Sequence, residues 1–463
     1  MTNYEPPPHG FRTFLIVWFT QSISLFGTAL TFFSVTIWLT QILYSRPEQK
    51  PELAFALAAV GLAGGIPIIF GAPIAGAWAD RHDRKRTMMV TDFLSGCLSV
   101  VIAVLMVTQL LNLGVLVVLV IIGAILGAFH NSAFDTSYAM LVPDKQLPRA
   151  NGMMQTMFAL SGILSPSIAA MIITLPELAR QGLIPTGIGA GLATLKDGVP
   201  LAISVDAITF FLAAIALIFL FIPSPQRTDL HSADGKKKSI WADVKEGALY
   251  IWYRRPLLWL LGTFTVINFV FAPLGIFLPL LVKFNLAPDW SARGMTFETA
   301  FALIATMGSV GGVLGGVFIS AWGGLKKRRV YGILLPMILV GTGMVVLGFS
   351  SWVYLTGALA LVGQGMGPLM NAHSQSIWQT QVPRELQGRV FSVRRLIAQF
   401  TSPISMALTG VFGGLFDPGW VIAAMGSIAI IFCVAQLFNP YLLRVEDKEW
   451  LDQLAAKRTE PSR

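Results

Sequence analysis

The sequence predicts an all-α integral membrane protein with twelve transmembrane helices in two parallel six-helix repeats. Three observations lead to this class. The chain of 463 residues is 54% hydrophobic and 12% charged, with a mean hydropathy of +0.68, whereas soluble domains carry about 25% charged residues. Its apolar residues form twelve long runs. A series of glycine and polar residues also recurs after about half of the chain, which indicates an internal duplication.

Each apolar run is long enough to cross a bilayer. We expect helices over residues 13–43, 53–79, 88–110, 114–141, 151–175, 200–222, 257–282, 299–322, 330–350, 352–381, 390–415 and 419–443. The longer runs are expected to tilt or to extend beyond the hydrocarbon layer. This pattern predicts four parts: a first half (1–222), a cytoplasmic linker (223–256), a second half (257–445) and a cytoplasmic tail (446–463).

Lysine and arginine are distributed unevenly over the two sides of this arrangement. With the N-terminus inside, only six of the 33 fall in outer segments: Arg46, Lys50, Arg180, Lys196, Lys283 and Arg293. The positive-inside rule therefore predicts a multi-pass protein of the cell membrane with both termini cytoplasmic and residues 176–199 outside. The first run is too long for the core of a signal peptide, so we expect no cleavable signal.

Several function classes are disfavoured. The net charge of +9 does not indicate nucleic-acid binding, because the bases lie in loops between apolar runs. Cys97 and Cys433 both fall within runs, so no disulfide framework is expected. No phosphate-binding loop, metal-ligand cluster or nucleophile–base pair stands out. We therefore expect no enzyme, no metal and no cofactor, and an ion gradient or the substrate itself as the energy source.

The internal repeat is clearest in the fourth and tenth runs. Every fourth residue of the fourth run lies on one helix face and is small or polar: Gly123, Gly127, Asn131 and Asp135. The tenth run has the same series 240 residues later: Gly363, Gly367, Asn371 and Gln375. The same offset relates Arg149 to Arg389, Val142-Pro143 to Val382-Pro383, and Gly71 and Gly76 to Gly311 and Gly316. Six helices per half is an even number, so the two repeats have the same orientation.

The loop after the second run carries the most specific motif. Residues 76–86 read Gly-Ala-Trp-Ala-Asp-Arg-His-Asp-Arg-Lys-Arg. They resemble the loop between helices two and three of the major facilitator superfamily, roughly G-x-L-a-D-r-x-G-r-k. The matching positions are Gly76, Ala79, Asp80, Arg81, Arg84 and Lys85, whereas Trp78 stands for the usual Leu and Asp83 for the usual Gly. The resemblance covers nearly the whole chain and implies the major facilitator fold.

Shorter matches resemble the branch with macrolide efflux and enterobactin exporter-like proteins. They are Val142-Pro143 with Arg149-Ala-Asn151-Gly152, and Asp243-Val-Lys-Glu-Gly247 with Arg254-Arg255-Pro256. Residues 239–253 also read as an amphipathic helix at the membrane interface. The resemblance implies a monomeric exporter that exchanges protons for a drug-like or macrolide-like small molecule, hydrophobic or amphipathic. Alternatives are a siderophore or lysophospholipid carrier, and a non-transporting membrane sensor or scaffold.

Charged residues inside the runs are the candidates for coupling, because intramembrane charges are usually functional or paired. Asp135 is the deepest carboxylate, and two interpretations stay open: it carries a proton, or it forms a fixed ion pair that latches the cytoplasmic gate. His130 is a second candidate for proton transfer, with simple hydrogen bonding as the alternative. Asp92 is expected at the cytoplasmic interface, paired with a base of the preceding loop, and Asp206 near the outer end.

The remaining candidates concern the gate and the substrate. The resemblance implies a gating motif of Gly76, Asp80, Arg81, Arg84 and Lys85. We expect Asp80 beside the start of the eleventh helix near Gly388, where unsatisfied N–H groups would bind its carboxylate. The candidate gate partners are Asp92, Arg149, Arg389, Arg394 and Arg395. The candidate cavity residues are Gln21, Ser24, Asn131, Asn268, Asn371, His373 and Gln375.

Overall fold

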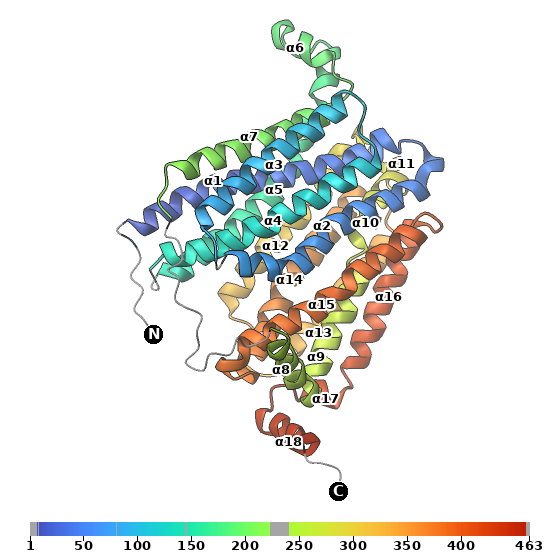
Figure 1. Cartoon of the computed structure of the whole chain (residues 1–463). Coiled ribbons are helices and arrows are strands. Elements are labelled where there is room, and N and C mark those ends of the chain that lie inside the picture. The colour runs from blue at the N-terminus through green and yellow to red at the C-terminus, as the bar shows by residue number, and fades with distance from the viewer. Residues whose placement is uncertain (1–6, 8, 80, 144–145, 223–239, 460–463) are drawn as a thin grey trace. The chain divides into compact units, whose positions relative to one another are not determined.

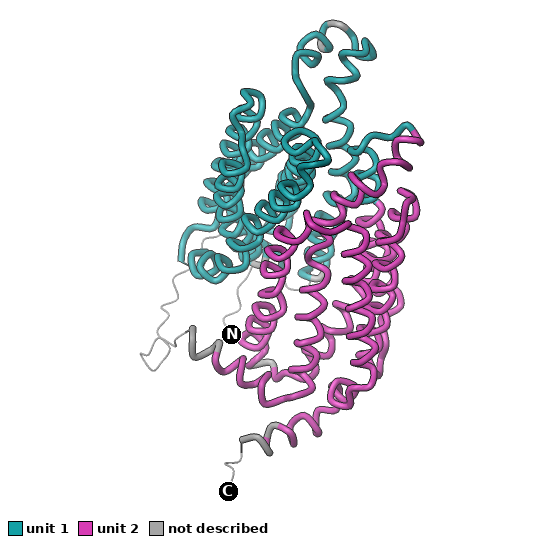
Figure 2. The backbone as a smooth tube through the Cα atoms, turned by 90° about the vertical axis from the view of Figure 1, so that its right-hand side faces the viewer, with its two compact units in different colours: residues 1–228, 294–306 teal, residues 229–293, 307–463 magenta. Residues whose placement is uncertain are grey.

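A computed structural model describes residues 7, 9–79, 81–143, 146–222 and 240–459 (Figure 1). Over these residues every regular element is a helix, which confirms the predicted class. By internal contacts the chain divides into two compact units (Figure 2). One consists of residues 1–228 and 294–306, the other of residues 229–293 and 307–463.

The first unit contains the six long helices of the first half. Helix α1 (Gly10–Ile37) continues as the π-helix η1 (Trp38–Leu43), and the short 3-10 helix η2 (Pro47–Gln49) leads into α2. The other helices are α2 (Lys50–Ala79), α3 (Arg84–Val107), α4 (Leu113–Leu141), α5 (Leu147–Arg180), α6 (Thr186–Ala193) and α7 (Val199–Ile218). Helix α7 packs against both α1 and α3, and α4 packs against α2 and α3 (Figure 1).

The second unit begins with the linker helix. Its helices are α8 (Ile240–Tyr253), α9 (Arg255–Phe271), α10 (Leu274–Phe284), α11 (Ala287–Ala292), α12 (Phe297–Trp322), α13 (Tyr331–Gly348), α14 (Val353–Gln381), α15 (Arg384–Phe412), α16 (Pro418–Gln436), α17 (Pro440–Leu443) and α18 (Lys448–Thr459). The first residues of α12, up to 306, belong to the first unit. Helix α15 packs against α8 and α9, and α13 packs against α14 and α16. The predicted linker helix over 239–253 is confirmed by α8.

Eleven of the described helical segments are long and apolar enough to cross a membrane. The remaining predicted run, the eleventh (390–415), is formed by α15, which is 29 residues long. It falls below the apolarity of the others because arginines lie along it. Most predicted bounds differ from the helices by a few residues, and two of the differences involve a proline. The run over 257–282 is interrupted between Phe271 and Leu274, where Pro273 lacks a backbone N–H. Helix α5 continues beyond residue 175 to Arg180, although Pro176 lies within it.

The two halves repeat in three dimensions as well as in sequence. Helices α4 and α14 end at Leu141 and Gln381, and the residues that follow have nearly identical backbones: Val142 has φ −102° and ψ 126°, and Val382 has φ −102° and ψ 125°. The hydroxyl of Ser165 on α5 donates to the carbonyl of Phe26 on α1. Its counterpart Ser405 on α15 donates to the carbonyl of Phe269 on α9. The predicted duplication is thereby confirmed.

Small residues bring helices α12 and α14 of the second unit into close contact. A Cβ atom added at Gly311 would lie 1.9 Å from the carbonyl oxygen of Leu361, and one at Gly315 would lie 2.0 Å from that of Gly365. Only glycine can occupy these positions without moving the helices apart. In the first unit the contact is looser, since a Cβ at Gly71 would lie 3.8 Å from that of Ala128.

Candidate functional site

A buried carboxylate in the first unit is surrounded by three helices. Asp92 lies on α3 and is only 1% exposed. The side-chain amide of Gln21 on α1 donates to its Oδ2 at 3.0 Å. The Nδ1 atom of His130 on α4 lies 3.0 Å from its Oδ1. The hydroxyl of Thr91 is 3.3 Å from the same imidazole nitrogen. The helices α1, α3 and α4 therefore assemble an acid–imidazole–amide cluster.

This cluster can change its charge by binding a proton. An ionised carboxylate inside a membrane protein is unfavourable without a partner, and Asp92 has both a neutral donor and an imidazole. One added proton takes the pair from negative to neutral. Because His130 is 16% exposed and Asp92 is 1% exposed, a proton would enter the cluster from the side of the imidazole.

The expectation that Asp92 pairs with a base of the preceding loop is wrong. Helix α3 begins at Arg84, so Asp92 lies two turns inside the helix. At that depth its side chain contacts Gln21 and His130 and is too far from the loop to pair with a base there. His130 keeps its predicted place among the candidates, and Gln21 belongs to the same cluster.

Asp135 differs from Asp92 in its surroundings. It lies further along α4 than His130 and its side chain is exposed. Asn131 of α4 is exposed as well, as is its counterpart Asn371 on α14. Both interpretations of Asp135, proton carrier and gate latch, remain predictions.

In the gating motif, basic side chains hold the loop to the helices beside it. Asp80, the expected latch, lies outside the described residues. Arg84 is 8% exposed; its Nε donates to the carbonyl of Ala79 and its Nη1 to that of Thr136 on α4, both at 3.2 Å. Lys85 donates to the carbonyl of Ile218 at the end of α7 at 2.9 Å. Arg81 is exposed and Gly76 is half-buried.

The two departures from the usual motif each have a local role. Asp83, where glycine is usual, has φ −63° and caps α3 by accepting from the backbone N–H of Arg86 at 2.8 Å. The position therefore needs no left-handed backbone here. Trp78, where leucine is usual, stacks on His82 with ring centroids 3.6 Å apart and meets the edge of Phe129. Both substitutions add contacts that order the loop.

His373 of the second unit is part of the packing. It is 3% exposed, and both ring nitrogens face backbone atoms: Nε2 accepts from the N–H of Leu325 at 2.9 Å, and Nδ1 lies 2.7 Å from the carbonyl oxygen of Leu369. A Cβ added at Gly324 or Gly332 would lie within 3 Å of the ring. The imidazole therefore fixes the loop after α12, which corrects the expectation that it lines a substrate cavity.

The gate-partner arginines have contacts within their own units. Arg394 donates to Oε1 of Gln375 at 3.1 Å and lies over the ring of Trp378, 5.3 Å from its centroid. Arg149 of the first unit lies 5.4 Å from the ring centroid of Phe11. Arg395 is exposed. Gln375 therefore binds an arginine at the position where the first half has Asp135.

The linker helix α8 docks on the first turns of α15. Glu246 forms an ion pair with Arg389, and the backbone of Arg389 lies so near Gly247 that a Cβ there would meet its carbonyl oxygen at 2.7 Å. The hydroxyl of Tyr250 donates to the carbonyl of Gln381 at 2.8 Å. Burial raises the pKa of the Tyr250 phenol. Trp252 stays 59% exposed, as expected of a residue that faces a membrane interface.

The remaining cavity candidates are Asn268 on α9 and Ser24 on α1. Asn268 of α9 donates to the carbonyl of Ala398 on α15 at 2.9 Å, so its amide supports helix packing. Ser24 of α1 is buried, and its carbonyl accepts from the hydroxyl of Thr28 at 3.2 Å. Among the described residues no three His, Cys, Asp or Glu side chains gather as a metal site requires.

Comparison with known proteins decides the family. The family model of the Major Facilitator Superfamily matches residues 17–406. The chain belongs to the major facilitator superfamily. It is 24% identical to macrolide efflux protein A of Streptococcus pyogenes over 91% of this chain and 94% of that protein. It is 26% identical to the multidrug efflux pump Tap of Mycolicibacterium fortuitum over 86% of this chain and 90% of that protein.

Solved structures of major facilitator transporters share the fold. A bacterial homolog of the human lysosomal transporter Spinster, inward-facing and unoccupied, aligns with a TM-score of 0.61 over 98% of this chain and 96% of that one, at 16% identity. A bacterial homologue of the iron transporter ferroportin aligns with a TM-score of 0.60 over 92% of this chain and 98% of that one, at 15% identity.

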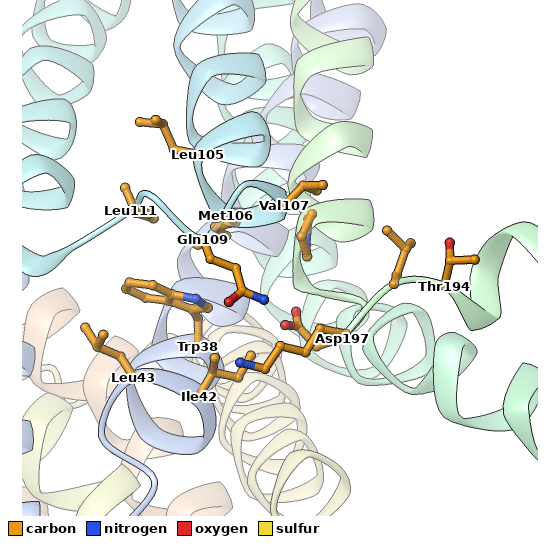
Figure 3. A pocket seen from close by; sticks show the side chains of 13 residues that line it. Trp38, Ile42, Leu43, Leu105, Met106, Val107, Gln109, Leu111, Thr194 and Asp197 are labelled. Carbon is orange, nitrogen blue, oxygen red and sulfur yellow. The ribbon is translucent and has the colours of Figure 1, made fainter.

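This major facilitator chain also has a pocket of about 260 Å³ in its first unit, remote from the Asp92 cluster along the helices (Figure 3). It lies where η1, the end of α3 and the residues between α6 and α7 meet. In Figure 3, Gln109 and Asp197 extend toward the same space beside Trp38. Burial raises the pKa of the Asp197 carboxyl above its ordinary value. None of the site residues predicted from the sequence lines this pocket.

The contacts of Asp92 with Gln21 and His130, and the ion pair between Glu246 and Arg389, were not predicted from the sequence. The pairing of Gln21 with Asp92 joins helices that are distant in the chain, but a signal was present: Gln21, Ser24 and Thr28 share one face of α1, which indicates a polar partner. The ion pair between Glu246 and Arg389 had no such signal: Arg389 was a candidate gate partner, but nothing in the sequence pointed to Glu246 as its partner.

Proposed function

We propose that this chain is a proton-coupled exporter of hydrophobic or amphipathic small molecules, working by alternating access. The observation that carries the coupling is the buried cluster of Asp92, His130 and Gln21. The substrate class is supported by the relatives, which are named for macrolide and multidrug efflux. In this superfamily architecture the substrate would bind between the halves near the bilayer midplane.

Each residue of the cluster has a distinct part in this proposal. Asp92 and His130 hold the proton between them, and the donor amide of Gln21 keeps the carboxylate turned toward α1. Protonation removes the negative charge from the centre of the first half, so rearranging α1, α3 and α4 becomes less costly. Release of the proton restores the charge. A conformational equilibrium that depends on this charge would couple proton flow to substrate export.

The gate in this proposal is the loop between α2 and α3. Asp80 would bind the helix N-terminus near Gly388 when the transporter faces outward, and this contact would break as the cytoplasmic side opens. Arg84 and Lys85 support that role, because they hold the loop rigidly against α4 and α7. An Asp80→Asn variant should favour the inward-facing state. Spin-label distances between the cytoplasmic ends of the halves would test this, and unchanged distances with normal transport would refute the latch.

The rival functions make different demands on the same residues. A siderophore or lysophospholipid carrier would use the same proton chemistry with another substrate. A membrane sensor or scaffold would need no titrating cluster and should tolerate Asp92→Asn. For localisation we propose a monomer in the plasma membrane, with both termini cytoplasmic and without a cofactor. Cysteine labelling at Ser232 and Thr186 from opposite sides would support this topology.

Transport by purified protein in liposomes tests the proposal. The panel would contain a macrolide, a lipophilic cation, a catecholate siderophore and a lysophospholipid, each with and without an imposed pH gradient. We expect gradient-driven accumulation of the macrolide or the cation. Asp92→Asn should abolish it but retain exchange of labelled for unlabelled substrate, because binding survives while coupling is lost. Glu449→Gln, a change of an exposed acid on α18, is the control. Gradient-driven transport by Asp92→Asn at the wild-type rate would refute the coupling role.

A further inference from the structure

A second acid is buried in the first unit, away from the Asp92 cluster. Asp206 lies on α7 and is 2% exposed. The hydroxyls of Thr31 on α1 and Ser99 on α3 donate to its Oδ2 at 2.8 and 2.9 Å. Its Oδ1 is also buried and has no hydrogen-bond partner among the described residues. Three helices therefore enclose the carboxyl group, and a third hydroxyl, that of Thr28 on α1, also lies beside it.

The space around Asp206 depends on one glycine. A Cβ atom at Gly27 of α1 would lie 2.8 Å from Oδ1 of Asp206 and 2.3 Å from the hydroxyl of Thr209. Any larger residue would push α1 away from α7 and separate Thr31 from the carboxyl group. The site is thus built by a close helix contact that only glycine permits.

Among the described residues of the helices packed on α7, the basic side chains of α1, α3 and α5 lie toward the helix ends, away from Asp206. Within α7 Asp206 is the only titratable residue, and α1 has none between residues 13 and 37. Helix α3 carries Arg84, Lys85 and Arg86 in its first turn, about four turns from Ser99, then Asp92 two turns from Ser99, and the thiol of Cys97. Helix α5 has charges only toward its ends: Arg149, Glu177 and Arg180, the last two paired at 2.8 Å. An ionised carboxylate with only neutral neighbours is costly inside a membrane.

The partners of Asp206 suit both of its protonation states. A hydroxyl group can donate one hydrogen bond and also accept. When the acid is ionised, Thr31 and Ser99 donate to it, as the structure shows. When it is protonated on Oδ2, one of the two hydroxyls can rotate and accept. A lysine or arginine could not do this, because it has no acceptor and would hold the acid permanently ionised.

A polar stripe links the two buried acids. Gln21, which binds Asp92, and Thr31, which binds Asp206, lie on one face of α1 with Ser24 and Thr28 between them. On α3, Ser99 follows Asp92 by seven residues, or about 10 Å along the helix. Asp92 lies near the start of α3 and Asp206 near the start of α7, and these helices run in opposite directions. The acids therefore mark the two ends of one polar seam.

We propose that Asp206 is a second proton-binding site of this transporter, which takes up and releases a proton between α1, α3 and α7. The inference rests on the proposed proton coupling and extends it from the Asp92 cluster to the other end of the seam. Its ligand is the proton itself, and the hydroxyls of Thr31 and Ser99 are positioning groups that keep the carboxyl group available in both states.

Infrared difference spectroscopy of the purified protein tests the site without substrate or gradient, so its outcome does not depend on the transport assay. A protonated carboxyl gives a C=O band that an ionised one lacks. We expect such a band in the wild type that disappears as the pH is raised and is missing in Asp206→Asn. Ser99→Ala should move the band, because one hydrogen bond to the carboxyl is lost. Asp197→Asn, a change in an acid just before α7, should leave it unchanged.

Several results would overturn the proposal. One is a wild-type spectrum from which Asp206→Asn removes no band, since Asp206 would then be ionised throughout. Another is a band assigned to Asp206 that persists at every pH at which the protein stays folded, since the proton would then never leave. A third is loss of the band on adding sodium at constant pH, which would assign the site to a metal ion. If Asp206→Asn fails to fold, an unmoved band in folded Ser99→Ala contradicts the proposal equally.

Discussion

The two halves hold the loop between their second and third helices in opposite ways. In the first half the side chain belongs to Arg84, the first residue after the loop, and it donates to the carbonyl of Thr136 on α4. In the second half it comes from the helix: His373 of α14 accepts from the N–H of Leu325 in the loop. At the 240-residue offset, Gly324 stands for Arg84, and the fully buried Ala133 stands for His373. In each half one large polar side chain joins the same two elements, but it belongs to the start of α3 in the first half and to α14 in the second.

The imidazoles of His373 and His130 accordingly have different roles. Both ring nitrogens of His373 are occupied by backbone atoms, so protonation would break the bond from Leu325. The imidazole of His130 instead has its Nδ1 atom 3.0 Å from a carboxylate oxygen of Asp92. A duplicated fold can therefore keep one half as a rigid framework and place titratable groups in the other. Asp135 and Gln375, which occupy equivalent positions, differ in the same way: the first half has an acid there, and the second has a neutral amide that accepts a hydrogen bond from Arg394.

The largest expected effect comes from removing the structural imidazole. His373→Ala leaves a cavity and an unpaired N–H at Leu325, so we expect a loss of about 2–4 kcal/mol in the free energy of unfolding. His130→Ala should lose roughly 1 kcal/mol, yet abolish gradient-driven transport. Heating with a thiol-reactive dye measures this, because Cys433 is fully buried in the second unit. Equal destabilisation by the two variants would contradict the division of roles.

A smaller effect is expected at Gly324. Its φ is +75°, and a Cβ there would lie 2.9 Å from Nε2 of His373. Gly324→Ala should therefore cost about 1–2 kcal/mol, from backbone strain and from the displaced imidazole. A double-mutant cycle with His373→Ala separates the two, since the clash disappears with the ring and the strain remains. Strict additivity would show that the loop and the ring do not interact.

The smallest effect is expected at Lys85. Its ammonium group caps the last turn of α7 at the carbonyl of Ile218, a contact near the surface. Lys85→Ala should reduce the free energy of unfolding by about 0.3–1 kcal/mol. The exposed Arg86 on the same loop provides the control, and Arg86→Ala should leave the melting temperature unchanged. A larger loss for Arg86→Ala than for Lys85→Ala would contradict the assignment of the cap.

The sequence predicted the elements that repeat or that obey a single periodicity. The apolar runs, the linker helix and the family motif each depend on residues close together in the chain, and the 240-residue offset shows as the same short pattern occurring twice. The candidate site was predicted less well, because its partners come from separate helices. Asp92 seemed to belong to the adjacent loop, and only the packing of α1, α3 and α4 brings it to Gln21 and His130.

Likewise, the role of His373 could not be predicted from residue type. A histidine within an apolar run reads the same whether its nitrogens face a carboxylate or the backbone, and the difference depends on the loop conformation at Gly323 and Gly324. The Glu246–Arg389 pair also required the docking of α8 on α15, which no local pattern encodes.

Proton release on substrate binding tests the central claim most directly. The purified protein would be placed in weakly buffered detergent solution with a pH indicator, and a compound shown to be transported would be added. We predict that the wild type and His373→Gln release protons, whereas Asp92→Asn releases fewer or none while binding the compound. Equal proton release from Asp92→Asn and the wild type would contradict the claim that the first half carries the coupling proton on Asp92 and His130.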